Sequence, residues 1–363
     1  MRKITELLRY AVEVGASDVH LVSGETPIFR QHGNLVQGGS ETLHEPLLQE
    51  MLLEIIPDRL QASFAEEHEV DFTLEEEGLG RFRANAFVEK GRPSLALRLV
   101  QTNVPTFEEL GLPPILADLA LSNSGIVLAS GPTGCGKSTS LARMVQHINE
   151  NLNKRIITLE DPIEFLFRNK SSVILQREIG TDTESFSAAL RSVFRQDPDI
   201  VMIGEMRDAA SFRAALTMAE TGHLVFSTLH TDTASQAINR ILNFFPPEER
   251  DIVQLSLSDN MRAVVCQRLV RGVDSRLLPT VEILINTPLV RKLLSNNDLE
   301  KLSAAIETDR ESGMRTFNQS LYQLVQDEKI TEETAMGQSL NPGQLQMLLE
   351  GINLDEERRI IAD

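Results

Sequence analysis

One eight-residue segment constrains the fold more than any other feature, because it fits the phosphate-loop pattern G-x-x-x-x-G-K-[ST]. The segment and the residue after it are Gly131, Pro132, Thr133, Gly134, Cys135, Gly136, Lys137, Ser138 and Thr139. An apolar run at 126–129 precedes the segment, and a helix-forming stretch begins near Thr139. A strand, a glycine-rich loop and a helix in this order surround a phosphate chain with backbone N–H groups and the positive end of a helix dipole. We therefore predict a nucleotide site, with Lys137 at the β- and γ-phosphates and Ser138 on Mg²⁺.

Downstream of this loop, short apolar runs alternate with helical stretches, and these runs fall at 155–159, 200–203 and 224–226. That alternation is typical of an α/β domain built around a buried sheet. The first 100 residues combine helical spacing with strand-like segments at 80–87 and 94–100, which indicates a smaller α+β domain.

The domain boundaries follow from breaks in these patterns. Pro105 and the Gly111-Leu-Pro-Pro segment interrupt the chain between the two patterned regions, and the apolar spacing after Pro288 is helical. We predict an α+β domain over 1–100, a linker over 101–112, an α/β domain over 113–287 and a helical region over 288–363. Within the last region, residues 355–359 are three acidic residues followed by two basic ones, and they are expected to form a solvated tail, with a partner contact as the alternative.

The charge balance limits which classes of molecule the chain is expected to bind. The chain of 363 residues has 35 Lys and Arg against 53 Asp and Glu, a net charge of -18. A negative surface opposes binding to phosphate backbones and to anionic lipid headgroups. Aromatic residues make up only 5% of the chain, with no Trp, which disfavours a base-stacking platform. We therefore expect no nucleic acid partner, and any contact with a membrane would pass through a protein.

The termini and cysteines favour the cytosol. The first residues carry charge instead of a continuous apolar block, so they do not resemble a secretory signal. No apolar stretch is long enough to span a membrane, so direct insertion is not expected. Cys135 and Cys266 form no C-x-x-C pair, which predicts two free thiols in a reducing compartment. Cys135 occupies a variable position of the loop, where it is expected to be a small filler.

Hydrolysis also needs an acid on the metal side and a group that positions water. Glu205 follows the apolar run 200–203 after one glycine, and Glu160, Asp161 and Glu164 follow the run 155–159. Ligands of α/β sheets bind at the carboxyl ends of the strands, where these acids are expected. Acids at strand ends are also common turn formers, and that alternative stays open for Asp161 and Glu164.

Two histidines, His223 and His230, bracket the apolar run that begins at residue 224. A histidine beside a phosphate loop can sense the γ-phosphate through a hydrogen bond. The alternative, that both are ordinary hydrogen-bonded polar residues, stays open from the spacing alone.

Taken together, four ordered segments closely resemble the secretion ATPase superfamily, and within it the PilT-like and PilU-like motors of the type IV pilus retraction branch. They are the phosphate loop and residues 160–164, 195–207 and 219–231, and the resemblance runs from 17–21 to about 320. It implies a RecA-like ATPase domain, a PAS-like N-terminal domain, and ATP with Mg²⁺ as cofactors. It further implies a cytoplasmic homohexamer at the inner membrane that acts on a platform protein there, with a paralogous motor ATPase as an additional partner.

The resemblance also implies residue roles. Glu164 is expected to orient or deprotonate water, Glu205 to lie on the metal side with Ser138, and His230 with His223 to couple the γ-phosphate to domain position. Arginines of the N-terminal domain close over the phosphates in relatives, and the matching positions are Arg83 and Arg98. Ordinary exposed strand arginines are the alternative for both.

Retraction is favoured over extension by three features. The N-terminal region is short, no tetracysteine insert is present, and residues 286–294 resemble the retraction signature helix. Of that signature only Arg291 and Leu293 are unchanged, and the choice between a PilT-like and a PilU-like motor stays open. The alternatives are an accessory ring with little hydrolysis, an extension or type II secretion ATPase and, disfavoured by charge, a nucleic acid translocase.

Overall fold

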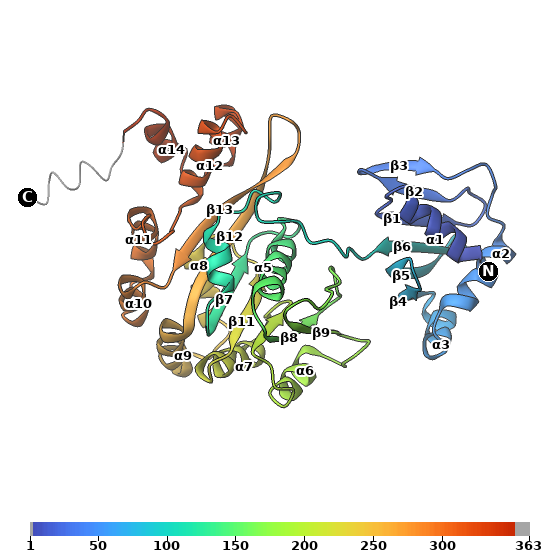
Figure 1. The fold of residues 1–363 in the computed structure, drawn as a ribbon, viewed down its shortest axis with the longest axis horizontal. Coiled ribbons are helices and arrows are strands. Elements are labelled where there is room, and N and C mark those ends of the chain that lie inside the picture. Colours follow the sequence, from blue (N-terminus) through green and yellow to red (C-terminus); the bar gives the residue numbers. More distant parts are fainter. Residues whose placement is uncertain (1–2, 353–363) are drawn as a thin grey trace, which may run out of the picture. The chain divides into compact units, whose positions relative to one another are not determined.

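The computed structural model describes residues 3–352, in two units that divide between Thr102 and Asn103 (Figure 1). The residues expected to form a solvated tail, 355–359, lie outside the described part. The segment predicted as a linker falls largely in the second unit, because all of it from Asn103 onward belongs there. The predicted boundary between 287 and 288 stays a prediction.

The first unit is an antiparallel sheet covered on one face by helices. Its strand order is β3-β2-β1-β6-β5-β4. The elements are α1 (Lys3–Glu13), β1 (Asp18–Val22), β2 (Ile28–Gln31), β3 (Asn34–Gln37), α2 (Glu45–Ile55), α3 (Asp58–Glu67), β4 (Glu69–Glu76), β5 (Gly80–Glu89) and β6 (Arg92–Leu99). Alternate strand residues such as Val19, Phe82 and Leu97 pack with Leu8 and Leu52 of the helices. The opposite face of the sheet is left with the polar residues of the same strands.

The hairpin of β2 and β3 is not predicted by the apolar pattern. Every residue of β3 is exposed, so the strand lacks the alternation that marks a half-buried strand. Its turn uses His32 and Gly33, both with positive φ, in place of the Asn-Gly pair that usually signals such a turn.

The second unit is built on a seven-stranded sheet with the order β13-β12-β7-β11-β10-β8-β9. All neighbouring strands are parallel except β12 and β13. Its strands are β7 (Gly125–Ser130), β8 (Arg155–Glu160), β9 (Val173–Glu178), β10 (Ile200–Ile203), β11 (Leu224–Leu229), β12 (Met261–Arg271) and β13 (Leu277–Ile285). Its helices before α10 are α4 (Ile115–Ala120), α5 (Lys137–Asn151), α6 (Phe186–Val193), α7 (Ala209–Glu220), α8 (Ala234–Leu242) and α9 (Pro247–Asn260).

Helices cover both faces of this sheet. Val127 of β7 faces one side, with α4 and α5, whereas its neighbours Ile126 and Leu128 face α6, α7, α8 and α9 on the other. Burial on both faces explains why these strands read as continuous apolar runs. The carboxyl ends of β7, β8, β10 and β11 consequently meet at one edge, which is where the phosphate loop begins.

Short helices follow the sheet, as the apolar spacing after Pro288 predicts. They are α10 (Pro288–Ser295), the 3₁₀ turn η1 (Leu299–Lys301), α11 (Leu302–Thr308), α12 (Phe317–Gln326), α13 (Glu332–Gln338) and α14 (Pro342–Leu349). The last three pack around the end of β12, where Val270 meets Leu321, Ile330 and Leu345. No helix within residues 3–352 combines the length and apolarity needed to cross a membrane.

Candidate active site

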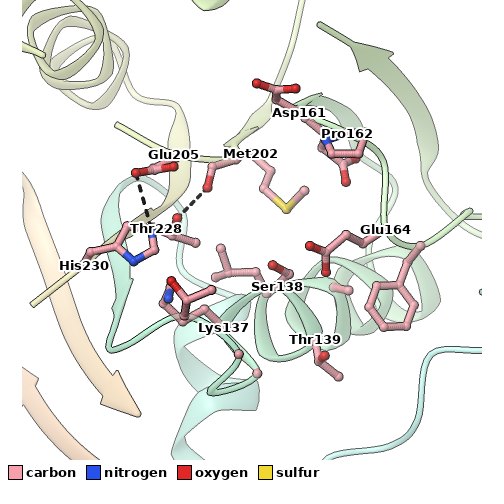
Figure 2. A pocket seen from close by; sticks show the side chains of 18 of the residues that line it. Lys137, Ser138, Thr139, Asp161, Pro162, Glu164, Met202, Glu205, Thr228 and His230 are labelled. Atoms are coloured by element: carbon pink, nitrogen blue, oxygen red, sulfur yellow. Dashed lines mark hydrogen bonds and ion pairs between the residues drawn. The ribbon is translucent and has the colours of Figure 1, made fainter. Parts of the chain in front are cut away.

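A cavity of about 390 Å³ lies where the carboxyl ends of the central parallel strands meet the start of α5. It is lined by most of the residues that the sequence singles out: Thr133, Gly134, Gly136, Lys137, Ser138, Thr139, Glu160, Asp161, Glu164, Glu205 and His230. Figure 2 shows Glu205 and His230 on one side of this pocket and Glu164 on the other, with Ser138 between them. The predicted phosphate site and the predicted acids are therefore brought together within one unit.

The phosphate loop needs glycine where it meets the neighbouring strand β12. Gly131 has a φ of 139°, and a Cβ there would lie 2.2 Å from the backbone oxygen of Gln267. The Gln267 side-chain amide donates to the Cys135 oxygen at 2.7 Å, and its own oxygen accepts from Ser140 Oγ at 2.7 Å. Gln267 thus braces both the loop and the first turn of α5. The sequence gives no local signal for this residue, because it acts across more than a hundred residues of chain.

Lys137 opens α5, and its side chain is buried within the loop. Its ammonium donates to the backbone oxygens of Gly131 and Pro132, each at 2.9 Å. Burial lowers the pKa of Lys137, while the carboxylates of Glu205 and Glu164 act in the opposite direction. Cys135 is buried beside it as a free thiol whose pKa is raised by burial, which fits a filler and not a nucleophile.

Glu205 follows β10 after Gly204, and its carboxyl contacts the side chains of Arg207 and His230. Its Oε2 lies 2.7 Å from Arg207 Nη2, and its Oε1 lies 3.3 Å from His230 Nε2. Burial raises the pKa of this carboxyl, but Arg207 and then His230 outweigh it, so the pKa lies below its ordinary value. Thr228 donates to the Gly204 oxygen at 2.6 Å and fixes the turn that delivers Glu205. Arg207 and Thr228 also line the pocket, and both lie inside segments that carry the resemblance although neither has a predicted role.

Glu164 reaches the pocket from a loop that β9 holds in place. The Ile163 N–H before it donates to Glu178, and after it the Gln176 side chain donates to the Phe165 oxygen and accepts from the Phe167 N–H. Glu164 itself is exposed toward the pocket. A carboxylate on a braced loop, free of an ion-pair partner among the described residues, is suited to accept a proton from water.

Glu160 differs from the other acids of its segment. It is the last residue of β8, and its carboxyl is buried and accepts from Thr158 at 2.6 Å and from Gln176 at 3.1 Å. Burial raises its pKa. Its hydrogen bonds tie β8 to β9, so it supports the loop that carries Asp161 and Glu164.

The two histidines lie at opposite ends of β11. His230 follows the carboxyl end and lines the pocket, whereas His223 precedes the amino end, where its Nδ1 lies 3.0 Å from the Met218 oxygen and from Thr221 Oγ1. A six-residue strand separates them, which spans roughly 20 Å. His223 therefore does not line the pocket that His230 lines within a single chain, and its expected role at the γ-phosphate stays a prediction.

Arg83 and Arg98 lie in the first unit, on β5 and β6. They are direct cross-strand partners in the sheet. Arg98 pairs with Asp18, at 2.7 Å between Nε and Oδ1. No ion pair of Arg83 is found among the described residues.

The donor set beside the loop suits Mg²⁺. The Ser138 hydroxyl and the Glu205 carboxylate line the same pocket, and Arg207 and His230 favour the charged form of that carboxylate. No cluster of three or more His, Cys, Asp or Glu side chains able to hold a metal occurs within the described residues. Mg²⁺ in phosphate sites takes few protein ligands and relies on phosphate oxygens and water, so the residues present fit it.

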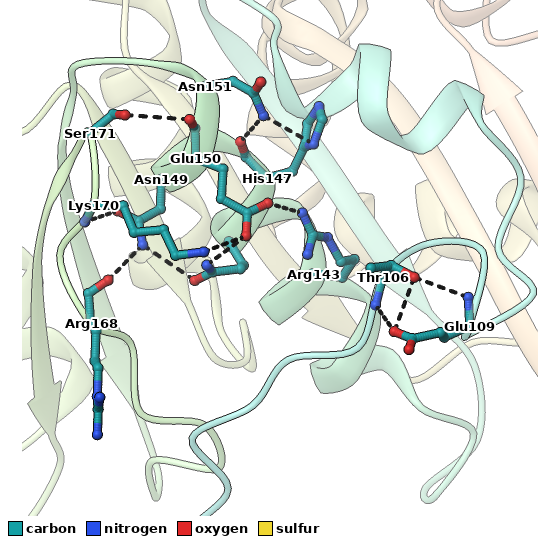
Figure 3. Close-up of polar contacts among 11 residues, drawn as sticks. Thr106, Glu109, Arg143, His147, Asn149, Glu150, Asn151, Arg168, Lys170 and Ser171 are labelled. Atoms are coloured by element: carbon teal, nitrogen blue, oxygen red, sulfur yellow. Dashed lines mark hydrogen bonds and ion pairs between the residues drawn. The ribbon is translucent and has the colours of Figure 1, made fainter.

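The helix that begins at the phosphate loop also anchors the start of the second unit, and Figure 3 shows the polar contacts of this helix around Arg143 and Glu150. Phe107 lies against Arg143 of α5, with 5.3 Å between the guanidinium carbon and the ring centroid, and against His147 at 5.5 Å between rings. Arg143 also pairs with Glu150, which in turn pairs with Lys170. The segment that follows the division at Thr102 is therefore attached to α5.

Comparisons with known proteins show which family the chain is similar to. The sequence profile of the family described as "Type II/IV secretion system protein" matches residues 1–335. The chain is 39% identical over 346 residues to "Type IV pilus ATPase PilU" of Pseudomonas aeruginosa, covering 95% of this chain and 91% of that protein. It is 40% identical over 332 residues to "Type IV pilus retractation ATPase PilT" of the same organism, covering 92% and 96%.

A solved structure confirms the predicted fold class. It is the "Crystal Structure of the Pilus Retraction Motor PilT and Bound ADP", which matches with a TM-score of 0.88 at 38% identity. The match covers 95% of this chain and 99% of that one. The predicted α/β ATPase domain with a smaller domain before it and helices after it is thereby borne out.

Proposed function

This chain belongs to the Type II/IV secretion system protein family, and we propose that it hydrolyses ATP in the Lys137 pocket to drive retraction of type IV pili. Its predicted enzyme class, an ATPase of the retraction branch, is confirmed by the likeness to PilT and PilU. The roles of individual residues and the assembly that follows are our proposals.

One observation carries the proposal: Lys137, Glu164, Glu205 and His230 line one pocket. Glu164 accepts a proton from the water that attacks the γ-phosphorus, and the bond to the bridging oxygen of ADP breaks. Lys137 offsets the charge of the phosphate oxygens. Ser138 and Glu205 would hold Mg²⁺, which neutralises phosphate charge when bound. His230 contacts Glu205 and is placed to report whether a γ-phosphate is present.

The working assembly is a cytoplasmic homohexamer at the cytoplasmic face of the inner membrane. Arg83 and Arg98 of the N-terminal domain close over the phosphates, and the domain motion turns a platform protein so that the pilus depolymerises. The net charge of -18 favours a basic docking surface on that partner and disfavours nucleic acid. A charge-reversal scan of the acidic surface that left platform binding intact would remove the docking part of this proposal.

The direct test is Lys137→Ala in the native host, with surface pili counted and twitching measured. Abundant pili without movement are expected, because extension continues while retraction stops. Bald cells would instead assign the chain to extension. The matched control is Lys154→Ala, since Lys154 is half exposed and pairs with Asp199 outside the pocket.

A second candidate is a PilU-like accessory ring that binds ATP and the main motor but hydrolyses little. It is favoured by the near-equal identities to PilU and PilT. Turnover by the purified protein separates the two functions, because the accessory ring would show little. Unchanged pili and movement in the Lys137→Ala strain would also point to the accessory ring.

A further inference from the structure

We propose that Asp18 is a positioning residue for ATP hydrolysis, because it grips the Arg98 guanidinium from the side and leaves both terminal nitrogens free to meet phosphate oxygens. This inference rests on the proposed function, in which Arg98 closes over the phosphates. Asp18 belongs to the segment 17–21, one end of the family resemblance, to which no role has been assigned.

The sheet register aligns the charged residues in one row. Asp18 of β1 is the direct partner of Arg98 on β6, and Arg98 is the direct partner of Arg83 on β5. Direct partners in an antiparallel sheet project from the same face. The row lies on the face away from the helices, since Val19 and Leu97, the chain neighbours of Asp18 and Arg98, are in the buried core. Both candidate phosphate arginines therefore stand on the polar face, and Asp18 lies directly across from Arg98.

Asp18 contacts the Nε atom of Arg98 and not its terminal nitrogens. The Arg98 Nε donates to Asp18 Oδ1 at 2.7 Å, and the two terminal nitrogens have no partner among the described residues. A guanidinium offers five donors in a fixed plane, so holding Nε sets the direction of the other four. The grip orients the plane without occupying the donors that would bind phosphate.

Asp18 is itself held firmly. Its side chain is 9% exposed, against 64% for Arg98. The Ser17 hydroxyl donates to Oδ2 at 2.7 Å, so the oxygen not used by Arg98 is also bonded. Burial raises the pKa of Asp18, but the hydrogen bonds from Ser17 and Arg98 outweigh it and keep the carboxyl charged. A buried, fixed anion thus anchors an exposed, otherwise mobile cation.

Arg30 is the second arginine near Asp18, and it serves as a control. Its Nε lies 3.9 Å from Oδ2, and its Nη1 donates to the Gly33 oxygen in the β2–β3 turn at 2.9 Å. Arg30 is therefore engaged in its own hairpin, and Arg30→Ala should leave the grip on Arg98 in place.

The experiment measures ATP turnover by the purified full-length chain. Asp18→Ala is expected to lower kcat by about 10- to 100-fold with the ATP KM changed by less than about threefold, because misplacing a charge-stabilising group affects mainly the transition state. Asp18→Asn keeps an oxygen within reach of Nε and should restore part of kcat. The matched controls are Arg30→Ala and Asp71→Asn. Asp71 is an exposed carboxylate on β4 that accepts a hydrogen bond from Asn85.

A double-mutant cycle decides whether Asp18 acts through Arg98. In an Arg98→Ala background, Asp18→Ala should cause no further loss of kcat beyond about twofold. An equal further loss would overturn the inference, since Asp18 would then act by supporting the domain. A normal kcat for Asp18→Ala alongside a low kcat for Arg98→Ala would also overturn it while the proposed function stands. A normal kcat for Arg98→Ala would remove the proposed role of that arginine and the inference with it.

If Asp18→Ala fails to fold, Ser17→Ala provides the test. It removes the hydroxyl on Oδ2 without changing charge, and it should lower kcat by about threefold in the presence of Arg98 and not in its absence. Equal effects in both backgrounds would contradict the proposal.

Discussion

Ser130 and Thr231 join the chain segments that leave two neighbouring strands, β7 and β11, beside the pocket. Ser130 is the last residue of β7, and its hydroxyl donates to the Thr231 oxygen at 2.9 Å while accepting from the Thr231 N–H at 2.9 Å. Gly131 of the phosphate loop follows Ser130, and His230 precedes Thr231. One buried hydroxyl thus sets the spacing between the phosphate loop and the histidine that contacts Glu205.

Ser130→Ala should lower both stability and turnover. The change leaves backbone groups of Thr231 unpaired, which costs about 1–3 kcal/mol in the free energy of unfolding, and loss of the fixed spacing should lower kcat about tenfold. Chemical denaturation and phosphate release measure the two effects. Ser227→Ala is the control, because Ser227 is equally buried on β11 and its hydroxyl has no partner among the described residues. Equal effects of the two changes would show that the Thr231 contact is unimportant.

Gly131→Ala and Gly134→Ala should separate the cost of a close backbone contact in the loop from the cost of a positive φ. A Cβ at Gly131 would lie 2.2 Å from the Gln267 backbone oxygen, whereas nothing lies within 4 Å of a Cβ at Gly134, although its φ is also positive. Gly131→Ala is expected to cost about 3 kcal/mol or more and abolish ATP binding, and Gly134→Ala about 1 kcal/mol. Thermal unfolding and titration with a fluorescent ATP analogue test this order, and the reverse order would contradict the close approach of β12.

Glu164→Gln should abolish hydrolysis and keep binding. An amide cannot accept the proton from water, so kcat should fall by about 10²–10⁴ while the Kd for ATP changes little. Asp161→Asn, which also lines the pocket, should lower kcat by less than about tenfold if Asp161 only forms the turn. Comparable losses for both variants would reject the assignment of the base to Glu164.

Glu150 should make the free energy of unfolding fall as the pH falls through the acidic range. Burial raises its pKa, but Lys170, Gln146 and Arg143 outweigh burial and lower the pKa from 4.5 to about 2. A carboxyl with a lowered pKa in the folded state stabilises fully above pH 4.5, and this contribution is lost as the pH falls toward 2. Glu150→Gln should therefore lower the free energy of unfolding by about 1–2 kcal/mol at pH 7, after screening by solvent. Denaturation at pH 7, 5 and 3.5 tests this, since a gap that stays constant would contradict it.

The family and the fold class could be predicted from the sequence because their signals are local. The phosphate loop, the acids after two apolar runs and the alternation of strands and helices each occupy a few neighbouring residues. The comparison with PilT and PilU confirms the class that these segments indicate.

What could not be predicted depends on pairing between distant residues. Gln267 braces the phosphate loop from β12, and Asp18 holds Arg98 from β1. Neither contact leaves a mark in the sequence around it. His223 is a residue that lies close to His230 in the sequence but not in space. The short separation suggested a shared site, but the extended strand β11 places the two histidines at its opposite ends.

The attachment of Phe107 to α5 connects the start of the second unit to the helix that begins at the phosphate loop. α5 has 15 residues and is roughly 22 Å long, and an α-helix resists bending over that length. Its first residue, Lys137, lies in the phosphate loop, and its middle residues Arg143 and His147 carry the Phe107 ring. A tilt of the helix at the loop end therefore displaces Phe107 as well. The segment leading back to Thr102 is therefore attached to the same rigid helix that begins with Lys137 of the phosphate loop.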